Sequence, residues 1–135
     1  MNEYISISEN EMDILELLWK AGRALSRPEL LEGLANRQKN PNALHQVLNG
    51  MMKKGILKVE GIVLCGKVYG RTYAPTMSQN EFLIHRTEEV LPDLSLGGRV
   101  LRVVSALTDQ EGIDEETIAE LEELLKARKQ ELSET

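Results

Sequence analysis

The chain has 135 residues, of which 41% are hydrophobic and 28% charged, and its formal net charge is −6. This composition is typical of one globular domain or two very small ones, and it excludes a disordered tail. No apolar run reaches the roughly 20 residues of a membrane span, the first residues lack a secretory-signal pattern, and the single cysteine excludes an internal disulfide, so we expect a cytoplasmic protein.

Charge is distributed unevenly along the chain. Ten basic residues face eight acidic ones up to Thr76, whereas six face fourteen in the remainder. Between residues 20 and 75 the ten basic residues face only Glu29, Glu32 and Glu60. The negative net charge argues against a nucleic-acid partner only when it is averaged over the whole chain. We expect the basic part and the acidic part to have different functions.

Local signals predict three helices in the first part of the chain. Three capping boxes, each pairing an N-cap serine with a glutamate three residues further on, predict helix starts. Ser8 and Ser26 begin the first two helices, and Ser78 begins a helix in the second part of the chain. The first helix should run over about 9–21. A third helix is expected to begin after Asn40 as N-cap, with proline at its first position, and to end at Gly55.

Strand-like residues follow the third helix. Ile56 to Leu64 and Lys67 to Tyr73 are rich in β-branched and aromatic residues, and they predict a hairpin around a two-residue turn of Cys65 and Gly66. Beyond the hairpin, helical periodicity and caps predict three further helices, over about 79–91, over about 96–107 and after Asp114.

The third helix presents a polar face opposite its apolar stripe. Four residues at helical spacing form the expected buried stripe: Leu44, Val47, Leu48 and Met51. The residues expected to face outward and to read DNA bases are Asn42, His45, Gln46 and Asn49. Asparagine and glutamine amides can form the bidentate pair that matches the major-groove edge of adenine.

Two helices, an amide-rich third helix and a basic hairpin have the order of a winged helix-turn-helix. We therefore predict a mainly α fold with a small β-hairpin. Residues 1–76 would be a winged helix-turn-helix DNA-binding domain, and residues 77–135 a C-terminal helical dimerisation segment. The polar side chains expected at DNA phosphates, several of them on the wing, are Asn40, Lys53, Lys54, Lys58, Lys67 and Arg71.

Four stretches in order along nearly the whole chain resemble the penicillinase-repressor family of winged-helix regulators (the BlaI/MecI/CopY group). They are ISENEMDILELLWKAG, QVLNGMMKKGIL, GRTYAP followed by MSQNEF, and IDEETIAELEELL. The resemblance implies a homodimeric repressor whose partners are double-stranded DNA, a second copy of itself and an inducer that the sequence does not identify.

The chain also departs from that family. Relatives carry threonines and an arginine along the third helix, where this chain has Ala43, Gln46 and Gly50, so its operator need not be theirs. Fourteen residues separate Gly55 from Gly70, which predicts an extended wing. The Asn-Phe pair that is cut in β-lactam-responsive members and the Cys-x-Cys motifs of copper-responsive members are both absent, so neither induction mechanism carries over.

Low aromatic content, 4%, leaves the chain few large core residues, and we expect a second copy to complete the core. The residues predicted at this dimer interface are Phe82, Val100, Leu101, Val104, Leu107, Ile118, Leu121, Leu125 and Leu132.

Besides a repressor, the sequence bears on an enzyme, a metal site, a protein-interaction module and a redox sensor. The sequence lacks a P-loop, a GxGxxG turn and an HExxH pair, so neither an enzyme nor a cofactor is expected. His45 and His85 lie forty positions apart, and no metal site is expected. Gly50 and the acidic composition keep open a winged-helix protein-interaction module without specific DNA binding, and Cys65 near Lys67 keeps open a redox sensor.

Overall fold

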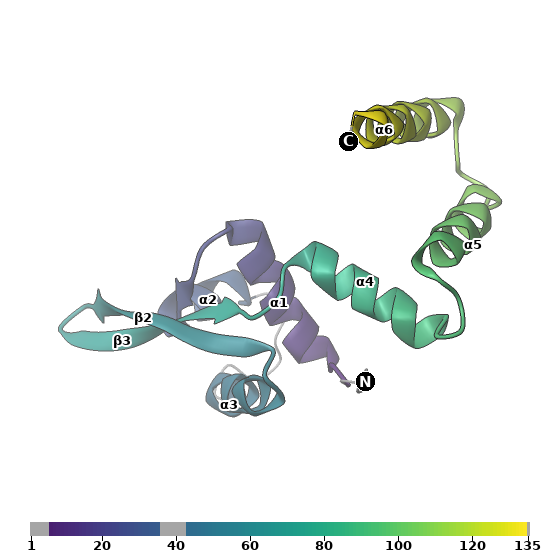
Figure 1. The fold of residues 1–135 in the computed structure, drawn as a ribbon. Helices are drawn as coiled ribbons and strands as arrows, with labels where there is room; N and C mark the ends of the chain where they lie inside the picture. The colour runs from purple at the N-terminus through teal and green to yellow at the C-terminus, as the bar shows by residue number, and fades with distance from the viewer. Residues whose placement is uncertain (1–5, 36–42, 135) are drawn as a thin grey trace. The chain divides into compact units, whose positions relative to one another are not determined.

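The structure is a computed structural model that describes residues 6–35 and 43–134. These residues form six α-helices and one three-stranded antiparallel sheet (Figure 1). In chain order, the elements are α1 (Glu9–Ala21), β1 (Leu25–Ser26), α2 (Arg27–Gly33), α3 (Leu44–Lys54), β2 (Leu57–Cys65), β3 (Val68–Pro75), α4 (Gln79–Val90), α5 (Leu96–Thr108) and α6 (Glu115–Ser133). The predicted fold class is confirmed, because a winged helix is followed by C-terminal helices.

All three predicted capping boxes form. In each, the serine Oγ accepts the backbone N–H of the glutamate, and that glutamate's carboxylate accepts the serine N–H. At α2 the side chain of Arg23 also donates to Glu29, and together with hydrogen bonds from Ser26 it lowers the pKa of Glu29 to about 2. Gly22 and Gly55 end α1 and α3 in the left-handed conformation, with φ of 68° and 78°, as the sequence predicts.

The described chain divides into two compact units, and the boundary lies between Arg86 and Thr87, inside α4. The first unit holds α1 to α3, the sheet and the beginning of α4, and the second holds the end of α4 with α5 and α6. The predicted functional division after Thr76 stays a prediction.

A hydrophobic core organises the first unit. It is built from apolar residues of α1, α2, α3 and the sheet: Ile14, Leu15, Leu18, Leu25, Leu30, Leu34, Leu44, Leu48, Met51, Ile56, Leu57 and Tyr73. Trp19 packs against this core. Its ring centroid lies 5.4 Å from that of Phe82 in α4, and its indole N–H donates to the Met77 carbonyl at 3.0 Å. These contacts attach the beginning of α4 to α1.

The hairpin forms where it is predicted, but its turn is one residue further along. Cys65 pairs with Val68, so Gly66 and Lys67 are the turn residues, and the predicted turn of Cys65 and Gly66 is wrong. Gly66 has φ +68°, which suits the first central position of a tight hairpin turn and explains the shift. A bulge at Glu60 interrupts the register of β2.

A third strand, β1, was not expected from the sequence. Its two residues pair with β3, Leu25 with Tyr73 and Ser26 with Thr72, which gives the sheet the order β1-β3-β2. Two residues are too few for a periodic pattern, and this strand exists only because β3 lies beside it.

The second unit is organised differently. Among its described residues, 87–134, only Arg99 is buried. None of the apolar side chains in this range is buried. Arg99 lies in α5 and reaches α4, where it donates to Thr87 Oγ1 at 3.3 Å and lies 3.6 Å from a carboxylate oxygen of Glu88. As predicted, Asp114 caps α6 by accepting the backbone N–H of Thr117. In a single chain, the described part of this unit has no buried apolar core.

Candidate nucleic-acid interface

Helix α3 turns one face to the core and the other to solvent. Leu44, Leu48 and Met51 are buried, and Val47 is half-buried, as the apolar stripe predicts. The polar side chains on the opposite face of the helix are exposed: His45, Gln46, Asn49 and Lys53. This spacing puts two amides, an imidazole and a cation on one accessible helix face.

Within that face, the Asn49 amide lies 3.3 Å from Nε2 of His45, one helical turn earlier. This contact can hold the two side chains in a fixed relation while the Gln46 amide remains exposed. Asn40 and Asn42, also predicted at DNA, and the predicted cap formed by Asn40 and Pro41 lie outside the described residues. The described helix begins at Leu44, after Ala43.

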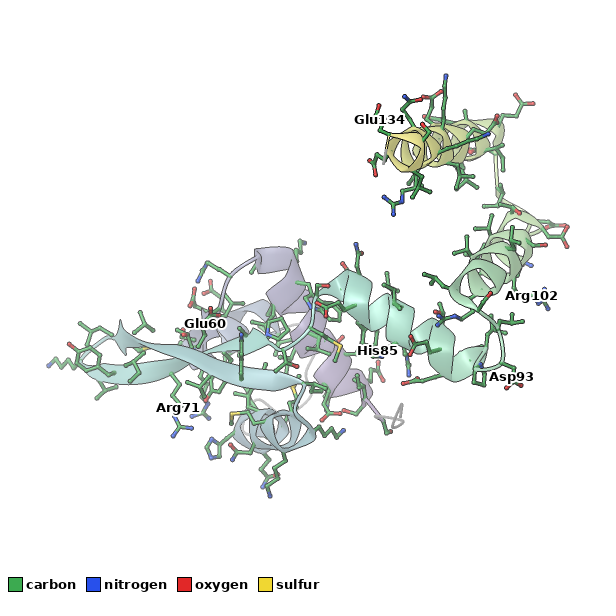
Figure 2. The ribbon with its side chains drawn as sticks, viewed as in Figure 1. Glu60, Arg71, His85, Asp93, Arg102 and Glu134 are labelled. Atoms are coloured by element: carbon green, nitrogen blue, oxygen red, sulfur yellow. The ribbon has the colours of Figure 1, made fainter. Side chains whose placement is uncertain are left out.

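The sheet places the basic wing residues on different sides. Side chains alternate along a strand, so Arg71 shares a face with Tyr73, whereas Lys58, paired with Ala74, lies on the opposite face. Figure 2 shows Arg71 on the side of the hairpin where α3 lies and Glu60 on the other side. Lys67 occupies the exposed turn. Of these basic wing residues, Arg71 is thus the one that lies on the side of the hairpin where α3 lies.

Lys54, predicted at phosphate, is engaged within its own chain. Its Nζ lies 2.6 Å from Oε1 of Glu11 and 2.7 Å from the Ser6 carbonyl. The Glu11 side chain is only 8% exposed. Burial raises the pKa of Glu11, but hydrogen bonds from Lys54 and from the Ser8 backbone outweigh it, so the pKa lies below the ordinary 4.5. Lys54 therefore links the end of α3 to the beginning of α1.

Replacing Lys54 should test this link. Lys54→Met leaves a nearly buried carboxylate without its cation, and we expect a loss of about 1–2 kcal/mol in unfolding free energy near neutral pH, given that Lys54 is itself partly exposed. A lowered carboxyl pKa stabilises the folded state above the unfolded pKa, and this contribution is lost as pH falls through the folded pKa. The deficit of the variant should therefore shrink below about pH 4.5.

Lys53→Met is the matched control for this prediction, because Lys53 is the exposed neighbour in the same helix. Urea unfolding of both variants at pH 7 and pH 3.5 measures the effect. Equal stability of the two variants at both pH values would contradict the structural role of Lys54.

The predicted dimer residues fall into two groups. Phe82 is buried in the first unit, against Trp19 and beneath the guanidinium of Arg86, which lies 5.5 Å from its ring centroid. The others belong to the second unit. Val100, Leu101, Leu107, Leu125 and Leu132 are exposed there, and Val104, Ile118 and Leu121 are half-buried.

Sequence reasoning missed two polar contacts. Glu11 and Lys54 lie 43 positions apart, and Arg99 and Thr87 belong to different helices, so neither pair leaves a local spacing signal.

The described residues hold no group of three or more histidine, cysteine, aspartate or glutamate side chains placed to bind a metal ion. Among them, no helix is long and apolar enough to cross a membrane.

Comparison with known proteins gives one family. The family model described as penicillinase repressor matches residues 7–127, which cover most of each compact unit. Among curated proteins, none matches the chain.

Proposed function

Because the chain belongs to the penicillinase-repressor family, a family of DNA-binding transcriptional repressors, we propose that it acts as a homodimer on a pseudo-palindromic operator. The observation that carries this proposal is the exposed polar face of α3, a helix that lies on the same side of the hairpin as Arg71 (Figure 2). A helix in the major groove and a wing on the adjacent backbone would use these two surfaces together.

Base recognition is assigned to His45, Gln46 and Asn49, with Asn42 before them. The exposed amides can each donate to and accept from one adenine edge, and such a pair discriminates between bases. The segment from Gly33 to Val59 contains no aspartate or glutamate, so this segment itself adds no carboxylate that would repel the phosphates flanking the groove.

Phosphate contacts are assigned mainly to Lys53, Lys67 and Arg71. Lys53 lies at the end of the exposed face of α3, Lys67 at the turn of the wing and Arg71 on the side of α3. Lys54 and Lys58 are less suited, because the first is bound to Glu11 and the second lies on the opposite face of the hairpin. Asn40 remains a further candidate.

A second copy of the chain is proposed to cover the apolar side chains of α5 and α6. Support comes from the second unit, in which no described apolar side chain is buried in one chain although many are present. A two-fold dimer would place the two α3 helices in successive major grooves about 34 Å apart.

Selection of bound sequences from random DNA, followed by titration of the selected site, tests the proposal. We expect a pseudo-palindrome bound at least 1,000-fold tighter than unrelated DNA. Gln46→Ala with Asn49→Ala should weaken binding to this site about 10- to 100-fold and leave unrelated DNA unaffected, because only base contacts are removed.

Lys67→Ala is the matched contrast. It should weaken binding to both DNAs and reduce the slope of log affinity against log salt by about one. Equally weak binding of the unmodified protein to all DNA would favour a protein-interaction module, an alternative that the glycine in α3 supports.

A further inference from the structure

The distal part of the β2–β3 hairpin extends beyond the rest of the sheet. Strand β1 pairs with β3 only at Tyr73 and Thr72. The four pairs from Ile62–Arg71 to Cys65–Val68 have no third strand beside them in the described chain. At about 3.3 Å per residue, this two-stranded ribbon reaches about 13 Å beyond the sheet before its turn.

The ribbon exposes a group of large apolar side chains, which are not expected on a hairpin that only extends into solvent. Tyr69 is 75% exposed, Ile62 72%, Val68 68% and Leu64 56%. Clustered exposed apolar side chains of this size indicate a contact surface, since single ones are common but groups are not.

The strand register sorts these side chains into two faces. Directly opposed residues share a face, so Ile62, Leu64, Tyr69 and Arg71 lie together. The other face holds Val63, Cys65 and Val68, and the thiol of Cys65 covers Gly70, where an added Cβ would lie 3.1 Å from Sγ.

The face that carries Tyr69 lies on the same side of the hairpin as α3. Arg71 belongs to this face, and Figure 2 shows it on the side of the hairpin where α3 lies. DNA with α3 in its major groove would therefore meet Tyr69 and Leu64 rather than Val68.

Charge indicates what this face contacts. From Gly61 to Pro75 the chain contains Lys67 and Arg71 and no acidic residue. Both cations lie beside Leu64 and Tyr69: Lys67 is at the turn, and Arg71 is two residue pairs nearer the sheet. Apolar side chains between cations suit the minor groove, where phosphates line both walls and side chains can part stacked bases.

On the premise of the DNA binding proposed above, we propose that Leu64 and Tyr69 insert as an apolar wedge between base pairs of the minor groove and bend the DNA. Lys67 and Arg71 hold the phosphates on either side of the wedge. The loss of base stacking is offset by burial of side chains that water otherwise surrounds.

The test uses the full chain and the DNA site selected as described above. Fluorescence resonance energy transfer between dyes at the two DNA ends measures the bend, which we expect at about 20–90°. Leu64→Ser with Tyr69→Ser should remove most of the bend and weaken binding about tenfold. Val63→Ser with Val68→Ser removes two apolar residues from the opposite face and should retain both bend and affinity.

Each possible outcome of this test either supports the wedge or overturns it. A specifically bound but straight DNA, or equal loss of bend in both double variants, overturns the wedge and leaves the proposed repressor standing. A change in molecular mass of the Leu64/Tyr69 variant without DNA, by light scattering, would make this face a protein contact and also overturn the wedge. Failure of the unmodified chain to select any DNA sequence removes the proposed function and the wedge with it.

Discussion

Leu125→Asp is expected to convert the protein from a dimer to a monomer and to weaken operator binding about 100- to 10,000-fold. Leu125 is 49% exposed in one chain and lies on the apolar side of α6 with Leu121 and Leu132. In a two-fold dimer the substitution occurs twice and buries two unpaired carboxylates. The loss of operator affinity is large because a monomer contacts only one half-site. Linking two half-site contacts in a dimer raises the affinity by a factor of this size.

Ala127→Asp is the matched control for the dimer variant. It adds the same carboxylate to the same helix, about half a helical turn away from the apolar side. Light scattering at micromolar concentration should show a dimer for the control and a monomer for Leu125→Asp. A monomeric unmodified protein, or equal masses for the two variants, would contradict the proposed interface.

Leu48→Ala has the second large expected effect, a loss of about 2–5 kcal/mol in the unfolding free energy of the first unit. Leu48 is 1% exposed and lies in the core that joins α3 to α1 and the sheet. Removal of three buried carbons costs their transfer from water and leaves a cavity that the packed neighbours fill only in part.

Leu83→Ala in α4 is the control, since Leu83 belongs to the same unit and is 54% exposed. It should cost under about 1 kcal/mol. Urea unfolding followed by circular dichroism compares the two variants. Equal midpoints would show that Leu48 does not hold α3 in place.

The elements that could be predicted from the sequence are those with local causes. Ser8 and Glu11 are three residues apart and make their capping contacts whatever the rest of the chain does, and the same holds at the other two boxes. The exposed face of α3 follows from its 3.6-residue period alone.

Features that depend on distant partners could not be predicted. β1 exists through β3: Leu25 and its partner Tyr73 lie 48 positions apart in the sequence. The engagement of Lys54 depends on Glu11, 43 positions away. Such pairings arise from the packed fold, and composition or spacing carries no trace of them. The turn at Gly66 differs, because a glycine suits the left-handed conformation at the first central position of a tight hairpin turn. This local signal favoured Gly66 and Lys67 as the turn residues over Cys65 and Gly66.

The contact between Trp19 and the beginning of α4 has a practical consequence. Trp19 is the single tryptophan of the chain, and its indole donates to Met77 and touches Phe82. Its emission therefore reports, without a label, whether α1 and α4 stay attached. A red shift on addition of a candidate inducer would identify release of α4 from the first unit, and an unchanged spectrum would place the inducer's action elsewhere.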